Sequence, residues 1–136
     1  LDEIEAINKT LNPGSVKCSY YLTPEPGQND EVLEKMGKGS LIINATGLGK
    51  DRPGSPLTDA AQFPENALVW EINYRGDLLF MHQAEAQAKE KNLHVEDGWK
   101  YFIYGWTQVI SEVFDIPIEG AVLDELDKIA AKFNQR

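Results

Sequence analysis

The feature that most constrains the fold is a short apolar run that ends abruptly in a glycine-rich loop. Residues 41–43 read Leu-Ile-Ile, and Asn44-Ala45-Thr46-Gly47-Leu48-Gly49 follows directly. A short run of mostly β-branched residues is typical of a buried strand in a parallel sheet. In open parallel sheets, ligands bind beyond the carboxyl ends of the strands. The sequence therefore predicts an α/β domain with a ligand site at this loop.

Helical and strand patterns alternate along the rest of the chain. Strands are predicted at residues 15–22, 41–43, 67–72 and 93–95, and helices at residues 1–11, 29–36, 77–91 and 119–133. A further long helix follows Asp97, which caps it, and Asp77 is the expected cap of the helix that begins there. Residues 23–28 and 53–66 are predicted loops, with one helical turn at residues 58–62. Strands that alternate with helices over short connections predict one domain, a parallel sheet with helices on both faces.

Composition excludes several classes of function. The net charge of −9 disfavours binding to nucleic acid or an anionic membrane, because both require clustered Lys and Arg. No apolar run approaches the roughly 18 residues of a membrane span, and residues 1–12 lack the pattern of a signal peptide. The lone Cys18 excludes an internal disulfide framework, and His82 and His94 have no partners at metal-ligand spacing. We therefore expect a cytoplasmic protein without a metal site.

Three loops follow predicted strands and are expected to meet at one edge of the sheet. They are residues 44–49, 73–76 and 97–98, and each contains glycine. Glycine lets the backbone approach a flat ligand closely, and free N–H groups can donate to carboxamide or phosphate oxygens. A single glycine of this kind is more often a turn residue. Three such clusters, each directly after a predicted strand, favour a binding site.

Other motifs carry less information. Gly37-Lys38-Gly39-Ser40 precedes a strand instead of opening a helix, so it is not a phosphate loop. Gly47-Leu48-Gly49 lacks the third glycine of a dinucleotide fingerprint. No Ser-His-Asp arrangement is readable, and we assign no catalytic residue. Trp99, directly after the predicted turn at Gly98, is retained as a candidate ligand contact.

Three motifs occur in a characteristic order. Asn44-Ala45-Thr46 comes first, then Glu71-Ile72-Asn73-Tyr74, then Asp97-Gly98 followed by an aromatic-rich segment. This order resembles the cofactor-binding half of the shikimate dehydrogenases, which carry an Asn-Ala-Thr loop, an Asp-x-x-Tyr strand end and an Asp-Gly-x-x-Met-Leu-x-x-Gln helix start. The resemblance covers residues 30–115. The longer loop over residues 47–57 resembles a divergent shikimate/quinate 5-dehydrogenase-like subgroup.

The resemblance implies roles for individual residues. Tyr74 matches the family's tyrosine, whose hydroxyl touches the substrate. The family's substrate-binding glutamine falls on Gly105, and Gln108, about one helical turn further on, is the candidate to replace it. Glu71 stands where the family has aspartate, and these departures leave the identity of the substrate open. The residues implied in cofactor binding are Asn44, Thr46, Gly47, Leu48, Ile72, Gly98 and Tyr101.

The resemblance also implies a larger enzyme. The family's nucleotide half begins with a strand, a glycine-rich phosphate turn, a helix and a second strand. These elements, and the family's catalytic lysine and aspartate, would precede residue 1. We therefore interpret residues 1–136 as the C-terminal portion of a Rossmann-like NAD(P)-binding domain that lacks its first βαβ elements. We expect this piece alone to be inactive, because hydride transfer needs cofactor and substrate held in register.

The implied reaction is the NADP- or NAD-dependent interconversion of 3-dehydroshikimate and shikimate, or of a related cyclic polyol acid. In that family it serves chorismate and aromatic amino-acid biosynthesis. An alternative is a non-catalytic Rossmann-like module that binds a partner or forms a homodimer through its apolar C-terminal helix. Gly105 and the lack of a phosphate turn favour that alternative. A third interpretation is another Rossmann enzyme with similar strand ends, such as a methylene-tetrahydrofolate dehydrogenase.

Overall fold

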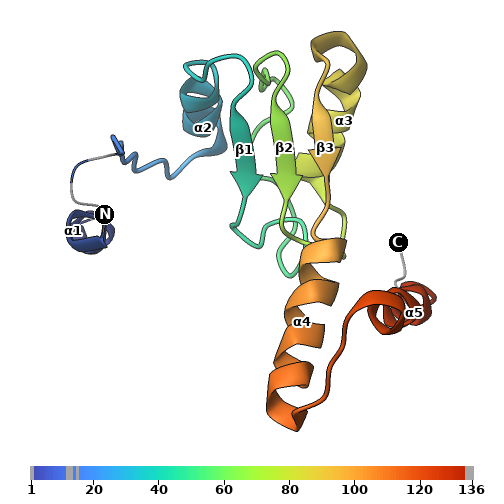
Figure 1. Cartoon of the computed structure of the whole chain (residues 1–136). Helices are drawn as coiled ribbons and strands as arrows, with labels where there is room; N and C mark the ends of the chain where they lie inside the picture. Colours follow the sequence, from blue (N-terminus) through green and yellow to red (C-terminus); the bar gives the residue numbers. More distant parts are fainter. Residues whose placement is uncertain (1, 12–13, 15, 134–136) are drawn as a thin grey trace.

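The centre of the fold is a three-stranded parallel sheet. The computed structural model describes residues 2–11, 14 and 16–133. The strands β1 (Leu41–Asn44), β2 (Leu68–Glu71) and β3 (His94–Glu96) lie side by side in that order. All three run in the same direction, so their carboxyl ends share one edge of the sheet (Figure 1). The protein is therefore an α/β protein with an open parallel sheet.

Five helices accompany the sheet in the described part of the chain. They are α1 (Asp2–Leu11), α2 (Pro26–Leu33), α3 (Leu79–Lys91), α4 (Trp99–Phe114) and α5 (Gly120–Ala131). The helix α2 lies beside β1, and α3 packs on β2 and β3 (Figure 1). By contrast, α4 continues away from the carboxyl edge of the sheet, and α1 and α5 lie apart from the sheet. None of these helices is long and apolar enough to cross a membrane.

The hydrophobic core lies on one face of the sheet. The register aligns Ile42, Val69 and Val95, so their side chains share that face. Val69 is completely buried and belongs to the same cluster as Phe63 and Phe80, whose rings meet edge to face at 5.8 Å. Both α2 and α3 contribute to this cluster, which extends into the loop before β2.

The prediction of helices on both faces of the sheet is wrong for the described residues. On the second face, Leu41, Ile43 and Leu68 keep 54%, 44% and 40% of their surfaces exposed. The physical reason is the direction of α4, which leaves the end of β3 without folding back across the sheet (Figure 1). Its main contact with that face is an edge contact between the rings of Trp70 and Tyr101.

The strand predicted over residues 15–22 is also wrong. Residues 16–22 form no strand, and residue 15 lies outside the described residues. Alternation of apolar and polar residues favours a strand only where a neighbouring strand accepts its backbone hydrogen bonds. This segment lies away from the sheet, with Val16 and Leu22 exposed. It contacts α1 through a hydrogen bond from Asn8 Nδ2 to the Tyr20 hydroxyl at 2.8 Å.

The helix predicted at residues 29–36 begins earlier, at Pro26. Proline is well suited to the first helical turn because a backbone N–H at that position has no acceptor within the helix. The lack of an N–H in proline therefore costs no hydrogen bond. Glu25 and Gln28 form a capping box, in which the Gln28 side chain accepts the Glu25 N–H at 3.1 Å. Residues 25–28, predicted as a loop because they contain proline and glycine, are therefore a helix start.

Two further local predictions need correction. Asp77 does not cap α3, which begins at Leu79 after Leu78 adopts a left-handed conformation with φ of 45°. The helical turn predicted at residues 58–62 is a hydrogen-bonded turn, closed by the Ala61 N–H and the Thr58 carbonyl at 3.2 Å. The predicted strands at residues 41–43, 67–72 and 93–95 are confirmed to within a residue or two at each end.

Candidate functional site

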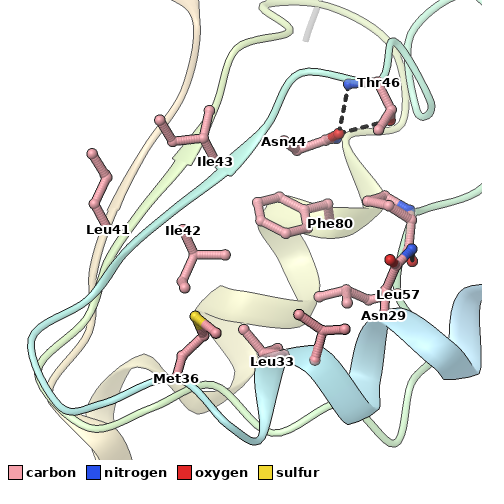
Figure 2. Close-up of a pocket in the computed structure, with 12 residues that line it drawn as sticks. Asn29, Leu33, Met36, Leu41, Ile42, Ile43, Asn44, Thr46, Leu57 and Phe80 are labelled. Carbon is pink, nitrogen blue, oxygen red and sulfur yellow. Dashed lines mark hydrogen bonds between the residues drawn. The ribbon is translucent and has the colours of Figure 1, made fainter. Parts of the chain in front are cut away.

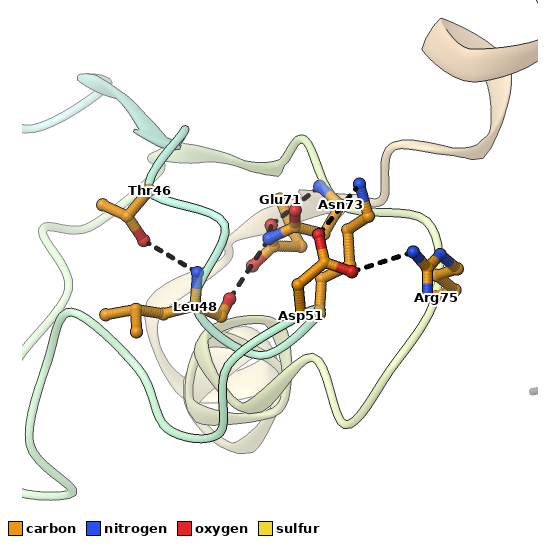
Figure 3. A network of polar contacts seen from close by, with 7 residues as sticks. Thr46, Leu48, Asp51, Glu71, Asn73 and Arg75 are labelled. Carbon is orange, nitrogen blue, oxygen red and sulfur yellow. Dashed lines mark hydrogen bonds and ion pairs between the residues drawn. The ribbon is translucent and has the colours of Figure 1, made fainter.

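A buried polar network joins the carboxyl ends of β1 and β2. Asn44 ends β1 with 1% of its surface exposed, and Glu71 ends β2 with 0% exposed. Asn44 Nδ2 donates to Glu71 Oε2 at 2.6 Å. Glu71 Oε1 accepts the backbone N–H of Asn73 at 2.8 Å and its Nδ2 at 2.6 Å (Figure 3). Both oxygens of the buried carboxyl therefore have partners, as burial requires.

The same network sets the conformation of the loop after β1. The Asn44 side-chain oxygen accepts the backbone N–H of Thr46 at 3.1 Å and its hydroxyl at 2.7 Å. The Thr46 hydroxyl accepts the Leu48 N–H at 3.2 Å, and the Leu48 carbonyl accepts Asn73 Nδ2 at 3.2 Å (Figure 3). Asn44, Thr46 and Leu48, all predicted from the sequence as site residues, are thus tied to one another and to the end of β2.

Electrostatics at Glu71 are dominated by burial. Loss of hydration raises the pKa of the Glu71 carboxyl above its ordinary value, because water no longer stabilises the charged form. The hydrogen bonds from Asn73 and Asn44 act in the opposite direction and are the weaker influence on this pKa. Because Glu71 is fully buried, it does not meet a ligand directly. Its role is to hold the two amide side chains in place.

Gly98 is required by the packing of the chain itself. It lies in the turn between β3 and α4, and its N–H donates to the Asn73 carbonyl at 3.0 Å. A Cβ atom at this position would lie 1.7 Å from the carbonyl oxygen of Ile72. The turn also holds Asp97, whose carboxylate accepts the Trp99 N–H at 2.9 Å. The prediction that Asp97 caps this helix is wrong by one residue, because the N-cap of α4 is Gly98. The predicted loop at residues 97–98 therefore does meet the end of β2.

The loop after β1 also packs against the residues that follow β2. Gly76 has a φ of 95°, and a Cβ there would lie 2.3 Å from the Gly49 carbonyl oxygen. The Arg75 guanidinium donates to Asp51 Oδ1 at 2.8 Å (Figure 3). Lys50 Nζ lies 3.5 Å from Asp51 Oδ2. The three loops predicted to converge are therefore in contact at the carboxyl edge of the sheet.

A pocket of about 280 Å³ opens beside this meeting point. Half of its lining residues are aromatic. The rings of Tyr74 and Phe102 stack with centroids 3.9 Å apart, and Tyr101 lines the pocket from α4. Ile72 also lines it, and Lys50 Nζ lies 5.5 Å from the centroid of the Tyr74 ring. Ile72, Tyr74 and Tyr101, which the sequence placed in one site, therefore do share a pocket.

A second cavity, of about 340 Å³, lies at the outer edge of β1 (Figure 2). Leu41 and Ile43 line it from the strand, Met36 lines it from beyond the end of α2, and Asn44 and Thr46 line one end. The predicted cofactor residues therefore do not share one cavity, and Gly47, Leu48 and Gly98 line neither of the two. Asn44 and Thr46 lie on this edge cavity, whereas Ile72 and Tyr101 lie on the aromatic pocket.

Some predicted site residues lie elsewhere. Gln108 is on the exposed side of α4, where its Nε2 donates to Glu112 at 2.7 Å, and it does not line the aromatic pocket. Gly105 does line that pocket. Lys50 and Phe102 also line it but were not predicted from the sequence, because only the folded loop and helix bring them to Tyr74. Within the described residues, no cluster of three His, Cys, Asp or Glu side chains could hold a metal ion.

Comparisons with protein-family models, with curated proteins and with solved structures find no match for this chain. The class that the geometry defines is an α/β protein with an open parallel sheet and a candidate ligand site at its carboxyl edge. That position is the one at which such sheets bind their ligands.

Proposed function

We propose that this chain is the C-terminal part of the NAD(P)-binding domain of a shikimate dehydrogenase-like oxidoreductase. The observation that carries the proposal is the contact among three strand ends, through Asn44, Glu71, Asn73 and Gly98, beside an aromatic pocket. The motifs that resemble the family fall at these strand ends and in this pocket. The reaction proposed for the whole enzyme is the NADP- or NAD-dependent interconversion of a cyclic hydroxy acid and its ketone, with shikimate as the reference substrate.

The free edge of β1 supports the idea that the domain is incomplete. In the described sheet, β1 has a neighbour on one side only, and the cavity at its other side is lined mainly by apolar residues. An unpaired strand edge beside exposed apolar surface is unusual in the complete sheet of a native domain. A strand of a preceding βαβ unit would pair with β1, and a helix of that unit would cover Leu41 and Ile43 on the face of the sheet. This is the fold that the resemblance implies.

The residues of this chain would position the reactants. A bound nicotinamide cofactor would supply the chemistry of hydride acceptance and donation. Ile72 and Tyr101 offer apolar walls that suit a flat ring, and the amide groups of the Asn44 network keep the strand ends rigid. The Tyr74 hydroxyl would orient the substrate. Moving the hydroxyl proton requires an acid–base pair that the resemblance places outside this chain, so we expect residues 1–136 alone to be inactive.

The test is a fluorescence titration of NADPH and NADH into two proteins. One is residues 1–136, and the other is the same chain extended to the limits of its open reading frame. Tight binding to the extended protein and little to residues 1–136 supports the proposal. An extended protein that binds neither cofactor, or a reading frame that adds no strand, glycine-rich turn and helix before residue 1, contradicts it.

Replacing Tyr74 with phenylalanine tests the proposed substrate contact. In the extended enzyme, Tyr74→Phe is expected to lower kcat/KM for shikimate about tenfold, the scale of one lost hydrogen bond. The stacking of this ring on Phe102 is retained, so the fold should be unaffected. Tyr104→Phe on α4 is the control, since Tyr104 does not line the aromatic pocket. Steady-state kinetics that are equal for Tyr74→Phe and Tyr104→Phe would show that the Tyr74 hydroxyl has no role in turnover.

A non-catalytic dimerisation module is the second candidate. One observation favours it: the C-terminal helix α5 exposes Val122 and Ile129, with 53% and 44% of their surfaces accessible. The preceding helix α4 also exposes Val113 and Phe114, with 69% and 68% accessible. Apolar surface of this extent commonly marks a protein interface. Sedimentation of the extended protein, measured alongside the cofactor titration, separates the two candidates. A dimer that binds no cofactor supports the module, whereas cofactor binding supports the oxidoreductase.

A further inference from the structure

Lys50 is the charged residue among those that line the aromatic pocket. Its side chain is only 25% exposed, and its ammonium group lies 5.5 Å from the centroid of the Tyr74 ring. The other lining residues are uncharged, and Tyr101, Phe102 and Trp106 among them are aromatic. A lysine ammonium held against an aromatic wall presents a localised positive charge to whatever enters the pocket.

The neighbours of Lys50 leave that charge incompletely balanced. Asp51 is shared by two cations, and the Arg75 guanidinium takes the closer position at 2.8 Å, while Lys50 lies at 3.5 Å. Two positive groups therefore face one carboxylate, and one of the two, Lys50, lines the pocket. This local excess of positive charge contrasts with the net charge of −9 of the whole chain. An anionic group of a ligand would neutralise the remaining positive charge.

The shape of the pocket indicates what carries that anion. The stacked rings of Tyr74 and Phe102 form a flat apolar surface. On α4, Gly105 leaves the space above the helix empty, because an added Cβ would have nothing within 4 Å. About 280 Å³ is just below the usual range of roughly 300–1,000 Å³ for ligand pockets, so the occupant must be small. A single six-membered ring with one charged substituent is of suitable size and character.

We infer that Lys50 is a substrate-recognition residue that binds the carboxylate of a ring-shaped acid seated against Tyr74. The inference rests on the proposed function only in taking this pocket as the substrate end of the site. It assigns carboxylate recognition to the loop after β1, independently of the cofactor.

The experiment uses benzoate and its uncharged counterpart, benzamide, as probes. Each is titrated into residues 1–136 and followed by ¹H–¹⁵N NMR. Benzoate is expected to shift the amide signals of Lys50, Tyr74 and Gly105 and to bind more tightly than benzamide. Lys50→Met, which keeps the apolar stem, should weaken benzoate binding about tenfold, the scale of one charge-assisted hydrogen bond. Lys50→Arg should retain most of the affinity.

Two further variants separate specific recognition from general charge effects. Asp51→Asn removes the competing carboxylate and should tighten benzoate binding, while Lys128→Met on α5 should leave it unchanged. Benzamide affinity should be the same in all these variants. Equal benzoate affinity for wild type and Lys50→Met, signals that shift only around another pocket, or no binding of benzoate up to its solubility would each overturn the inference. Because no cofactor is present, failure of the NADPH titration and failure of this one are distinguishable.

Discussion

Gly98→Ala is expected to destabilise the protein by more than about 3 kcal/mol, the range of severe backbone and packing defects. The added Cβ would lie 1.7 Å from the Ile72 carbonyl oxygen, and the backbone of Asn73 is also closer than contact distance allows. Neither neighbour is a flexible side chain that could move aside. The β3–α4 turn would have to separate from the end of β2, which would break the hydrogen bond from Gly98 to Asn73. Urea denaturation followed by circular dichroism measures the loss.

Gly105→Ala is the matched control for this prediction. Gly105 lies within α4, where an added Cβ has nothing within 4 Å. Alanine is more favourable than glycine in a helix interior by about 0.5–1 kcal/mol, so this variant should be slightly more stable than the wild type. The same chemical change is therefore expected to have opposite signs at two glycines. A Gly98→Ala protein as stable as wild type would mean that the turn does not approach β2 as described.

The sheet was predictable from the sequence because its strands have strong local signals. The runs at β1 and β2 are apolar, contain β-branched residues and are bounded by polar loop residues, and the helix pattern before β3 is long. The segment at residues 16–22 has a similar local pattern but no neighbouring strand. Strand formation depends on that neighbour, which a local pattern does not specify. The uncovered face of the sheet was missed for a related reason, since the direction of α4 is set by tertiary packing.

The position of the site was predictable, but its chemistry was only partly so. Glycine after each strand indicated where the loops meet, and topology then brings Asn44 and Asn73 to one edge. The sequence did not reveal that Glu71 is buried between them. Nor did it place Lys50 against Tyr74, because that contact depends on how the loop at residues 47–52 folds back. The sequence shows that this loop contains glycines, but it does not show that they adopt the left-handed conformation that the fold of the loop requires.

Glu71→Gln is expected to lower the free energy of unfolding by about 2 kcal/mol at pH 7, the cost of leaving a buried donor without an acceptor. The Glu71 carboxyl accepts three hydrogen bonds, from Asn44 Nδ2 and from the backbone and side chain of Asn73. Glutamine offers one acceptor oxygen, so its NH₂ group would face one of these donors. Thermal denaturation monitored by circular dichroism measures the difference.

The difference in stability between the wild type and Glu71→Gln depends on pH. This dependence tests whether burial or hydrogen bonding has the larger effect on the pKa of Glu71. Burial raises its pKa in the folded protein above the ordinary value of 4.5, so the folded state binds the proton more readily than the unfolded state. The resulting contribution to stability is fully present below the unfolded pKa and is lost as pH rises through the folded one. The wild-type advantage over Glu71→Gln should therefore grow as pH falls from 7 towards 5. If the advantage shrinks instead, the hydrogen bonds from Asn44 and Asn73 outweigh burial, and the network favours a charged carboxylate at the centre of the site.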